Sequence, residues 1–303
     1  MDASAHALRS MIFIPGHRHD LLPKAVMSGA DAVIIDLEDA VAPAEKPRAR
    51  AGLAELPDAP IPLYVRTNGP DTEMLWDDVV AAGRAGVAGL VIPKAESPEV
   101  LRELDGALRA LEMAFSLEVG SIVVAPLIES AVGVRSTYDM VRSSDRVVTV
   151  LFGSGEQGDL VADLGVAWTP EGTGLMHARS KVLLDARAAG LGHPMDAVFM
   201  DFRNLDALRT ECELARRLGY GGKVAIHPAQ VPVINEVFTP SEQEVAHSRL
   251  IIEEFDRALA EGEASIAVDG RMVDYAVARV ARTVLARAEL AARAADRKED
   301  TDT

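Results

Sequence analysis

The sequence predicts a (β/α)8 TIM barrel of the α/β class, followed by a C-terminal helical extension. Short apolar runs alternate with amphipathic segments as far as about residue 235, as strands and helices do in such a barrel. There are eight of these runs, and most of them end in charged or polar side chains. An open, doubly wound sheet is the alternative fold for the same alternation. We therefore expect a barrel over residues 1–235 and a separate C-terminal segment over residues 236–303.

Each predicted strand is an apolar run that is too short for a helix and is bounded by turn residues, which is typical of a fully buried strand. The eight strands are Met11–Gly16, Ala32–Asp36, Leu63–Thr67, Gly89–Pro93, Ile122–Ile128, Val147–Phe152, Ala197–Asp201 and Lys223–His227. The clearest amphipathic helices between them are Asp20–Met27, Met74–Ala85, Pro98–Leu111 and Leu205–Leu218. We find no internal repeat and no linker within this region.

The C-terminal segment has a different pattern, a helix, a hairpin and a second helix. A capping box over Thr239–Glu242, with proline at the first helical position, predicts a helix that ends at about Ala260. Ile266–Val273 is predicted to form a hairpin that turns on an Asp-Gly pair, and Val277–Arg293 a last helix. The polar tail from residue 297 is expected to fray. We expect this segment to act as a lid or as an oligomerisation element.

Composition excludes several classes of protein. The formal net charge of −16 argues against nucleic acid or an anionic membrane as the partner, although local cations could still bind a small anionic substrate. No apolar run is long enough for a transmembrane helix, and the first residues do not resemble a signal peptide. The one cysteine, Cys212, excludes an internal disulfide and fits a reducing compartment, so we expect a cytoplasmic protein. Cys212 lies in a helical pattern and is predicted to be a buried thiol rather than a nucleophile.

Two neighbouring strands end in carboxylates. The apolar run within Val123–Ser130 ends at Glu129, and the next strand, Val147–Phe152, is followed by a loop that contains Glu156 and Asp159. The carboxyl ends of parallel strands meet at one edge of the sheet, where ligands bind in α/β folds. Carboxylate oxygens from both strands could hold one hard divalent cation. We therefore predict a magnesium site at these strand ends.

The loop after the sixth strand also matches a dinucleotide-binding fingerprint, with glycines at Gly153, Gly155 and Gly158. We reject that function because the fingerprint belongs after the first strand, and because the acidic residues of this loop would repel a pyrophosphate. The other strands also end in side chains that could contact a ligand. These are Asp36, Glu38, Asp39, Arg66, Asn68, Lys94, Glu96, Asp201 and His227. Single acidic residues at such positions often cap helices, but their concentration at one face favours an active site.

Ten motifs, in order along nearly the whole chain, resemble the citrate lyase β-subunit family, the acyl-CoA lyase branch of the HpcH/HpaI aldolase group. They are Arg9–Gly16, Ala30–Val41, Lys46–Arg50, Val65–Asn68, Ile92–Ser97, Pro126–Ser130, Asp159–Gly165, Ala225–Gln230, Phe238–Ser241 and Asp269–Asp274. The resemblance implies a TIM barrel, a magnesium ion and a thioester of a hydroxy acid as the substrate. We assign substrate binding to residues that lie in these motifs, namely Arg9, Asp36, Glu38, Arg66 and Lys94.

The resemblance also implies roles for individual residues. Glu129 is the expected first metal ligand and Asp159 the second. Glu156 is the alternative second ligand, because relatives have a shorter spacing between the glycine after the sixth strand and the metal aspartate. Arg66 is expected to act in catalysis. Asp274 is the expected acid/base residue, presented to the barrel of a neighbouring subunit, which implies a homo-oligomer, a trimer or a multiple of one.

The function that the resemblance implies, and that these residues fit, is a magnesium-dependent carbon–carbon lyase. It would cleave or form a β-hydroxyacyl-CoA, such as malyl-, citramalyl- or citryl-CoA, with acetyl-CoA and a 2-oxo acid as the products of cleavage. This chemistry needs an activated hydroxyl, a stabilised enolate and an acid that protonates carbon, for which magnesium, Arg66 and a carboxylic acid are suited. One alternative is a class II aldolase that acts on 4-hydroxy-2-oxo acids. The other is a carrier-dependent citrate lyase β subunit.

Overall fold

The computed structural model describes residues 8–169 and 171–299 and divides the chain into two compact units after Val237, close to the predicted boundary. The first unit contains eight parallel strands. They are β1 (Ser10–Pro15), β2 (Ala32–Asp36), β3 (Leu63–Arg66), β4 (Gly89–Ile92), β5 (Val123–Ile128), β6 (Leu151–Phe152), β7 (Met195–Asp196) and β8 (Gly222–Ala225). Each strand pairs with the next, and β8 pairs with β1, so the sheet is closed. The predicted TIM barrel is confirmed, and the open sheet is excluded.

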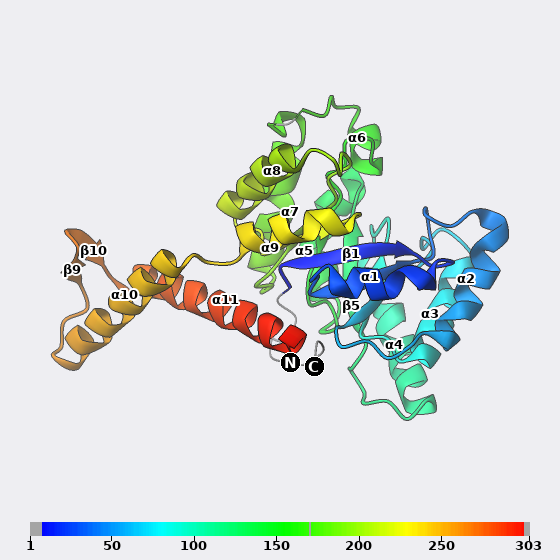
Figure 1. Cartoon of the computed structure of the whole chain (residues 1–303), viewed down its shortest axis with the longest axis horizontal. Coiled ribbons are helices and arrows are strands. Elements are labelled where there is room, and N and C mark those ends of the chain that lie inside the picture. The colour runs from blue at the N-terminus through cyan, green and yellow to red at the C-terminus, as the bar shows by residue number, and fades with distance from the viewer. Residues whose placement is uncertain (1–7, 170, 300–303) are drawn as a thin grey trace. The chain divides into compact units, whose positions relative to one another are not determined.

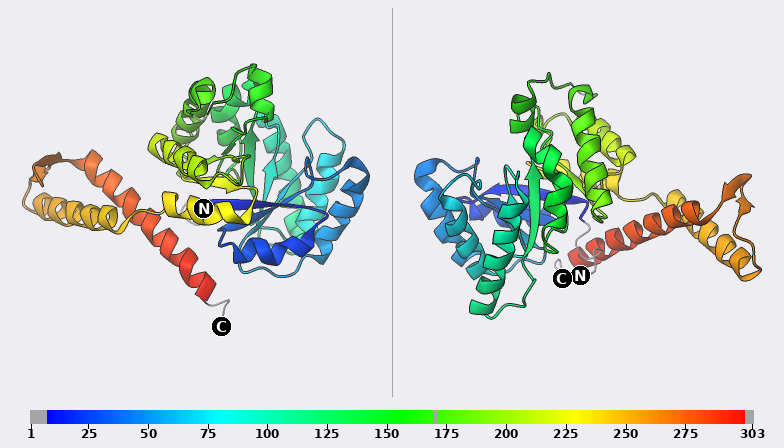
Figure 2. Two further views of the ribbon diagram at one scale, coloured as in Figure 1. Left: turned by 45° about the horizontal axis from the view of Figure 1, so that its top comes forward. Right: turned by 180° about the vertical axis from the view of Figure 1, so that it is seen from behind.

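Helices surround this barrel on the outside (Figures 1 and 2). The α-helices are α1 (Leu22–Met27), α2 (Lys46–Gly52), α3 (Met74–Ala85), α4 (Pro98–Ala114), α5 (Ala131–Arg142), α6 (Asp159–Leu164), α7 (Met176–Ala188), α8 (Leu205–Leu218) and α9 (Val231–Phe238). Short 3-10 helices occur at His19–Leu21, Pro43–Glu45, Leu53–Glu55, Thr173–Leu175 and Pro228–Gln230. Cys212 is buried in α8, as predicted, and burial raises the pKa of its thiol to about 12.

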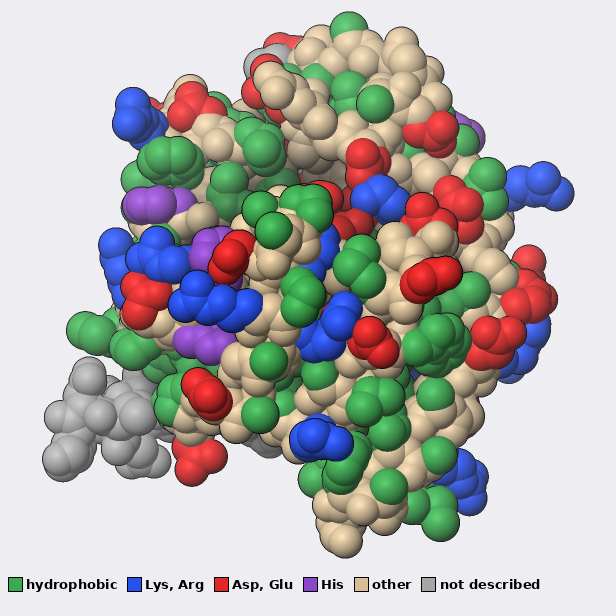
Figure 3. Space-filling model, turned by 90° about the vertical axis from the view of Figure 1, so that its right-hand side faces the viewer, with side chains coloured by type: hydrophobic (Ala, Val, Ile, Leu, Met, Phe, Trp, Pro, Cys, Tyr) green, Lys and Arg blue, Asp and Glu red, His purple; other side chains and the backbone are tan. Residues whose placement is uncertain are grey.

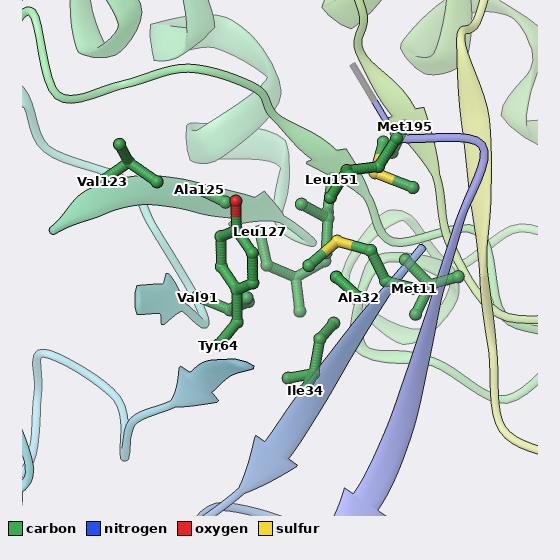
Figure 4. Packing of buried hydrophobic residues seen from close by; sticks show 12 residues of the cluster. Met11, Ala32, Ile34, Tyr64, Val91, Val123, Ala125, Leu127, Leu151 and Met195 are labelled. Atoms are coloured by element: carbon green, nitrogen blue, oxygen red, sulfur yellow. The ribbon is translucent and has the colours of Figure 1, made fainter. Parts of the chain in front are cut away.

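Apolar side chains fill the barrel interior (Figure 4). Ala32 and Ile34 of β2 point inward, while Val33 and Ile35 of the same strand are equally buried on the other face, against the helices. Burial on both faces explains why the strands are continuously apolar in sequence. Tyr64 occupies the interior beside Gly89, where a Cβ atom would lie 2.5 Å from the tyrosine ring. The absence of a side chain at residue 89 therefore makes room for Tyr64.

The seventh strand was predicted wrongly at Ala197–Asp201, because the paired residues are Met195 and Asp196. Met195 fills the interior, whereas the carboxylate of Asp196, fully buried, accepts a 2.7 Å hydrogen bond from Lys223 Nζ. Charged residues are rarely buried unless they are paired, so a strand that contains Asp196 was not expected from the sequence alone. Of the predicted sixth strand, Val147–Phe152, only Leu151 and Phe152 form a regular strand. Val147 makes a single isolated β-bridge.

The second unit consists of α10 (Glu242–Ala260), a hairpin of β9 (Ile266–Val268) and β10 (Arg271–Val273), and α11 (Tyr275–Glu299). The predicted helix, hairpin and helix are therefore present. The capping box begins at Ser241 rather than at residue 239, since Ser241 Oγ accepts from the backbone of Glu244, whose carboxylate accepts from the backbone of Ser241. Phe255 packs in a small apolar core of this unit. Among the described residues, no helix combines the length and apolarity needed to cross a membrane.

Candidate active site

Charged side chains from the carboxyl ends of β2, β3, β4 and β5 form one connected set. Figure 3 faces the end toward which β1 points, and it shows acidic and basic side chains side by side in the middle of that face. This is the end of a TIM barrel at which active sites are found. The arrangement therefore brings together most of the residues predicted from the strand ends.

Arg66 is held in place by Asp36, its neighbour across β2 and β3. Its Nε and Nη2 atoms donate to the two carboxylate oxygens of Asp36 at 2.7 and 2.6 Å, and its Nη1 lies 3.2 Å from Glu38 Oε2. The guanidinium also lies over the ring of Phe13, 4.8 Å from its centroid. Burial disfavours its charge, but the hydrogen bonds and charge of Asp36 raise the pKa of Arg66 further above its usual value. The guanidinium is therefore permanently charged and rigidly oriented.

Asp36, which was predicted to bind substrate, is buried beside Arg66. This carboxylate is 1% exposed and also accepts hydrogen bonds from the backbone N–H groups of Glu38 and Ala40. Each of its oxygens thus already has two donors, one from Arg66 and one from the backbone. In this structure Asp36 acts as the anchor of Arg66.

Lys94 connects the carboxylates of three strand ends. Its backbone is left-handed, with φ of 47°, and its N–H donates to Glu129 Oε1 at 2.8 Å. Its ammonium donates to Glu38 Oε1 at 2.7 Å and lies 3.3 Å from Asp159 Oδ2. A strained backbone of this kind persists only where surrounding contacts hold it, and such positions cluster at functional sites. The ammonium of Lys94 compensates part of the negative charge of the carboxylates around it.

Glu129 is buried at the end of β5, beside the opening of the barrel. Burial raises the pKa of its carboxyl to about 7, although the hydrogen bond from the Lys94 backbone opposes this shift. Burial likewise raises the pKa of Glu38, against the charge of Arg66. Carboxyls with perturbed pKa values in a cleft are typical of functional sites.

Glu129 and Asp159 line the same cavity, which has a volume of about 490 Å³. Asp159 is the first residue of α6 and is half-exposed. Glu156 is exposed in the preceding loop and does not line the cavity. In the described part of the chain, no cluster of three or more His, Cys, Asp or Glu side chains is arranged as a metal centre. Two carboxylates nevertheless suit magnesium, which usually takes one or two of them and completes its coordination with water and substrate.

Two predicted site residues lie elsewhere. Arg9 precedes β1 at the amino end of the barrel, where its guanidinium donates to Asp31 at 2.7 and 3.0 Å. This end is opposite the cavity, so Arg9 does not lie with the other predicted site residues. Asp274 belongs to the second unit and caps α11, since its Oδ1 accepts from the backbone N–H groups of Ala276 and Val277 at 2.9 and 3.1 Å.

The sequence alone did not reveal a network of hydrogen bonds among Lys46, Asn68 and Asp78, which we call the clamp. Lys46 of α2 donates to the carbonyls of Leu37 and Glu38 at 3.0 and 2.9 Å and to the side chain of Asn68. Asn68 in turn donates to the buried carboxylate of Asp78 in α3 through both its backbone and its side chain. The clamp fixes the strand ends that carry Glu38 and Arg66. Asn68 can be recognised in the sequence as a polar residue after β3, but its partners, which are distant in sequence, cannot.

We expect Asp159→Asn to weaken magnesium binding by at least about tenfold, because it removes an anionic ligand, whereas the matched variant Glu156→Gln should leave the affinity nearly unchanged. Isothermal titration calorimetry of each variant with magnesium chloride measures both affinities. The assignment of Asp159 is overturned if the Glu156 variant loses affinity and the Asp159 variant does not.

The family model for HpcH/HpaI aldolase/citrate lyase matches residues 9–228. The chain belongs to the HpcH/HpaI aldolase/citrate lyase family. Among relatives in this family, citrate lyase subunit beta of Leuconostoc mesenteroides subsp. cremoris is 32% identical over 281 residues, which are 91% of this chain and 92% of the relative. L-malyl-CoA/beta-methylmalyl-CoA lyase of Rhodobacter capsulatus is 33% identical over 319 residues, 95% of this chain and 97% of the relative.

A solved structure extends the comparison. Protein CitE from Mycobacterium tuberculosis, in complex with magnesium, acetoacetate and coenzyme A, superposes with a TM-score of 0.75 and 31% sequence identity. The match covers 94% of this chain and 99% of that protein. The resemblance to the citrate lyase β-subunit family that the sequence motifs indicated is thus confirmed.

Proposed function

We propose that this chain is a magnesium-dependent carbon–carbon lyase that cleaves or forms a β-hydroxyacyl-CoA, such as malyl-, citramalyl- or citryl-CoA, with acetyl-CoA and a 2-oxo acid as the cleavage products. The observation that carries the proposal is the pair of carboxylates, Glu129 and Asp159, that line one cavity beside Lys94. A relative named as a malyl-CoA lyase and a neighbour solved with magnesium and coenzyme A support it.

Glu129 and Asp159 are the residues that would hold magnesium, and the bound ion would supply a Lewis acid for the oxygens of the substrate. Arg66, whose Nη1 lies beside Glu38, would stabilise the negative charge that develops on the departing enolate. Because Asp36 already fixes the guanidinium, little reorganisation is needed when that charge appears. Glu38 orients both Arg66 and Lys94 through its two oxygens.

The acid that protonates the enolate carbon is proposed to be Asp274 of a neighbouring copy of the chain. Its own unit exposes large apolar side chains near this residue, namely Met272 at 67%, Tyr275 at 60% and Val280 at 64%. Met272 lies on β10, and Tyr275 and Val280 lie in the first turns of α11; exposed apolar groups concentrated in one region favour contact with another surface. We therefore propose a homo-oligomer, a trimer or a multiple of one. The reduced, buried Cys212 suits the cytoplasm as the compartment.

The purified chain, given free malyl-CoA and magnesium, should release acetyl-CoA and glyoxylate, and chelation of the metal should stop the reaction. A second candidate, a carrier-dependent citrate lyase β subunit, is favoured by the relatives of that name. It predicts no turnover of the three free CoA thioesters named above and activity only on a substrate attached to its carrier protein. Comparing free with carrier-bound thioesters therefore separates the two functions.

We expect Arg66→Lys to lower turnover by roughly two to three orders of magnitude, the range for losing one preorganised donor. Lysine keeps the charge but loses the planar pair of N–H groups that Asp36 holds. Turnover has to be measured per folded molecule, because a weakened pair with buried Asp36 also reduces stability. A variant that is less stable but turns over normally when folded would show that Arg66 is purely structural.

A further inference from the structure

The cavity beside the proposed metal ligands has an apolar wall. It comprises residues at the end of β4, in the following turn and in the first turn of α4, together with one residue of the loop after β3. The apolar lining residues are Pro70, Ile92, Ala95, Val100 and Leu101. The wall lines the same cavity as Glu129 and Asp159, so we infer that a substituent of the 2-oxo acid part contacts it.

The polar lining of the cavity is strongly acidic. Five carboxylates line it, namely Asp71, Glu96, Glu129, Asp159 and Asp163. Lys94 is the single Lys or Arg side chain among the described lining residues, and its ammonium already contacts Glu38 and Asp159. The hydroxyls of Ser97 and Ser130 accept hydrogen bonds from the backbone at the starts of α4 and α5. A magnesium ion and Lys94 together suit one substrate carboxylate, but the lining offers no counter-charge to a second one.

We propose that this site selects thioesters whose 2-oxo acid part carries hydrogen or a short alkyl substituent and rejects one that carries a second carboxylate. This inference rests on the proposed lyase function and names its substrate class. Contact with the apolar wall stabilises a bound alkyl group. A single methylene in a hydrophobic pocket changes the discrimination between substrates by roughly 10- to 200-fold. A second carboxylate would instead lie among like charges in a partly enclosed space, an arrangement that excludes the wrong ligand by repulsion.

The test compares kcat/KM for malyl-, citramalyl- and citryl-CoA, which would release glyoxylate, pyruvate and oxaloacetate. We expect citramalyl-CoA to exceed citryl-CoA by at least about 100-fold, within the discrimination that contacts of this kind supply. Cleavage of citryl-CoA within about tenfold of citramalyl-CoA would overturn the proposal. Absence of turnover with all three thioesters would overturn the proposed function, and the specificity would fall with it.

Two variants test which part of the lining acts. Val100→Phe narrows the apolar wall from half-buried Val100, so the citramalyl-to-malyl ratio of kcat/KM should fall roughly tenfold. Leu108→Ala is the control, because Leu108 is buried on the same helix and does not line the cavity. It should lower stability and leave the ratio unchanged. An equal loss with both substrates in the Val100 variant would contradict the role of the wall.

Glu96→Lys tests the charge. Glu96 is exposed at the cavity, and replacing its negative with a positive charge should raise the citryl-to-malyl ratio roughly five- to tenfold at low ionic strength. Glu96→Gln should give a smaller rise in the same direction, and added salt should reduce both effects. A ratio that neither variant changes would show that charge does not set the specificity.

Discussion

Glu129→Gln is expected to abolish magnesium-dependent cleavage while the barrel remains folded. Glutamine keeps the shape of the side chain and can still accept the hydrogen bond from the Lys94 backbone, so the end of β5 should not move. It lacks the negative charge that a hard divalent cation requires. We expect turnover to fall by roughly a thousandfold or more, the upper range for losing one preorganised electrostatic contact.

Two measurements separate the metal site from the fold. Magnesium should raise the melting temperature of the unmodified protein by binding the native state, and this rise should be lost in Glu129→Gln. Glu103→Gln, on the exposed side of α4 and outside the cavity, is the matched control and should keep both activity and the magnesium effect. Unchanged magnesium affinity and turnover in Glu129→Gln would refute the assignment of this residue as a ligand.

The barrel could be predicted from sequence because its strands are buried on both faces. Runs such as residues 32–35 of β2 are continuously apolar and therefore recognisable without knowledge of their partners. The seventh strand lacked this signal, since it consists of Met195 and a buried Asp196 whose charge is matched by Lys223 on the next strand. A buried ion pair joins residues far apart in sequence, and alternation of apolar residues does not reveal it.

Only those site residues that follow directly from the end of a strand could be predicted from the sequence. Glu129 was identified because an apolar run stops at a single carboxylate. Asp36 looked equally available, but the register of β2 and β3 places it directly beside Arg66, and a pattern within one strand does not contain that register. Arg9 comes before the first strand in sequence, which already places it at the amino end; the resemblance of its motif to the family, and not its position, led to its assignment to the site. The left-handed backbone of Lys94 likewise depends on contacts with neighbouring strands.

Asp274→Asn is expected to remove most of the activity without weakening the helix that Asp274 caps. The side-chain oxygen of asparagine can accept the same two backbone N–H groups of α11, and asparagine is as good an N-cap as aspartate. The amide cannot donate a proton as a carboxylic acid does, so the step that protonates the enolate carbon should fail. Asp274→Ala loses the cap as well, and a comparison of the two variants separates stability from catalysis.

Mixing two inactive variants tests whether Asp274 serves a neighbouring barrel. In oligomers refolded from equal amounts of Asp274→Asn and Glu129→Gln chains, a site that draws on two copies is intact when its barrel comes from the first variant and its acid from the second. Random assembly of a symmetric ring makes this true of about one quarter of the sites, so activity should recover to about that fraction. If each chain used its own Asp274, every mixed site would lack one of the two residues, and no activity would return although native mass spectrometry showed mixed oligomers.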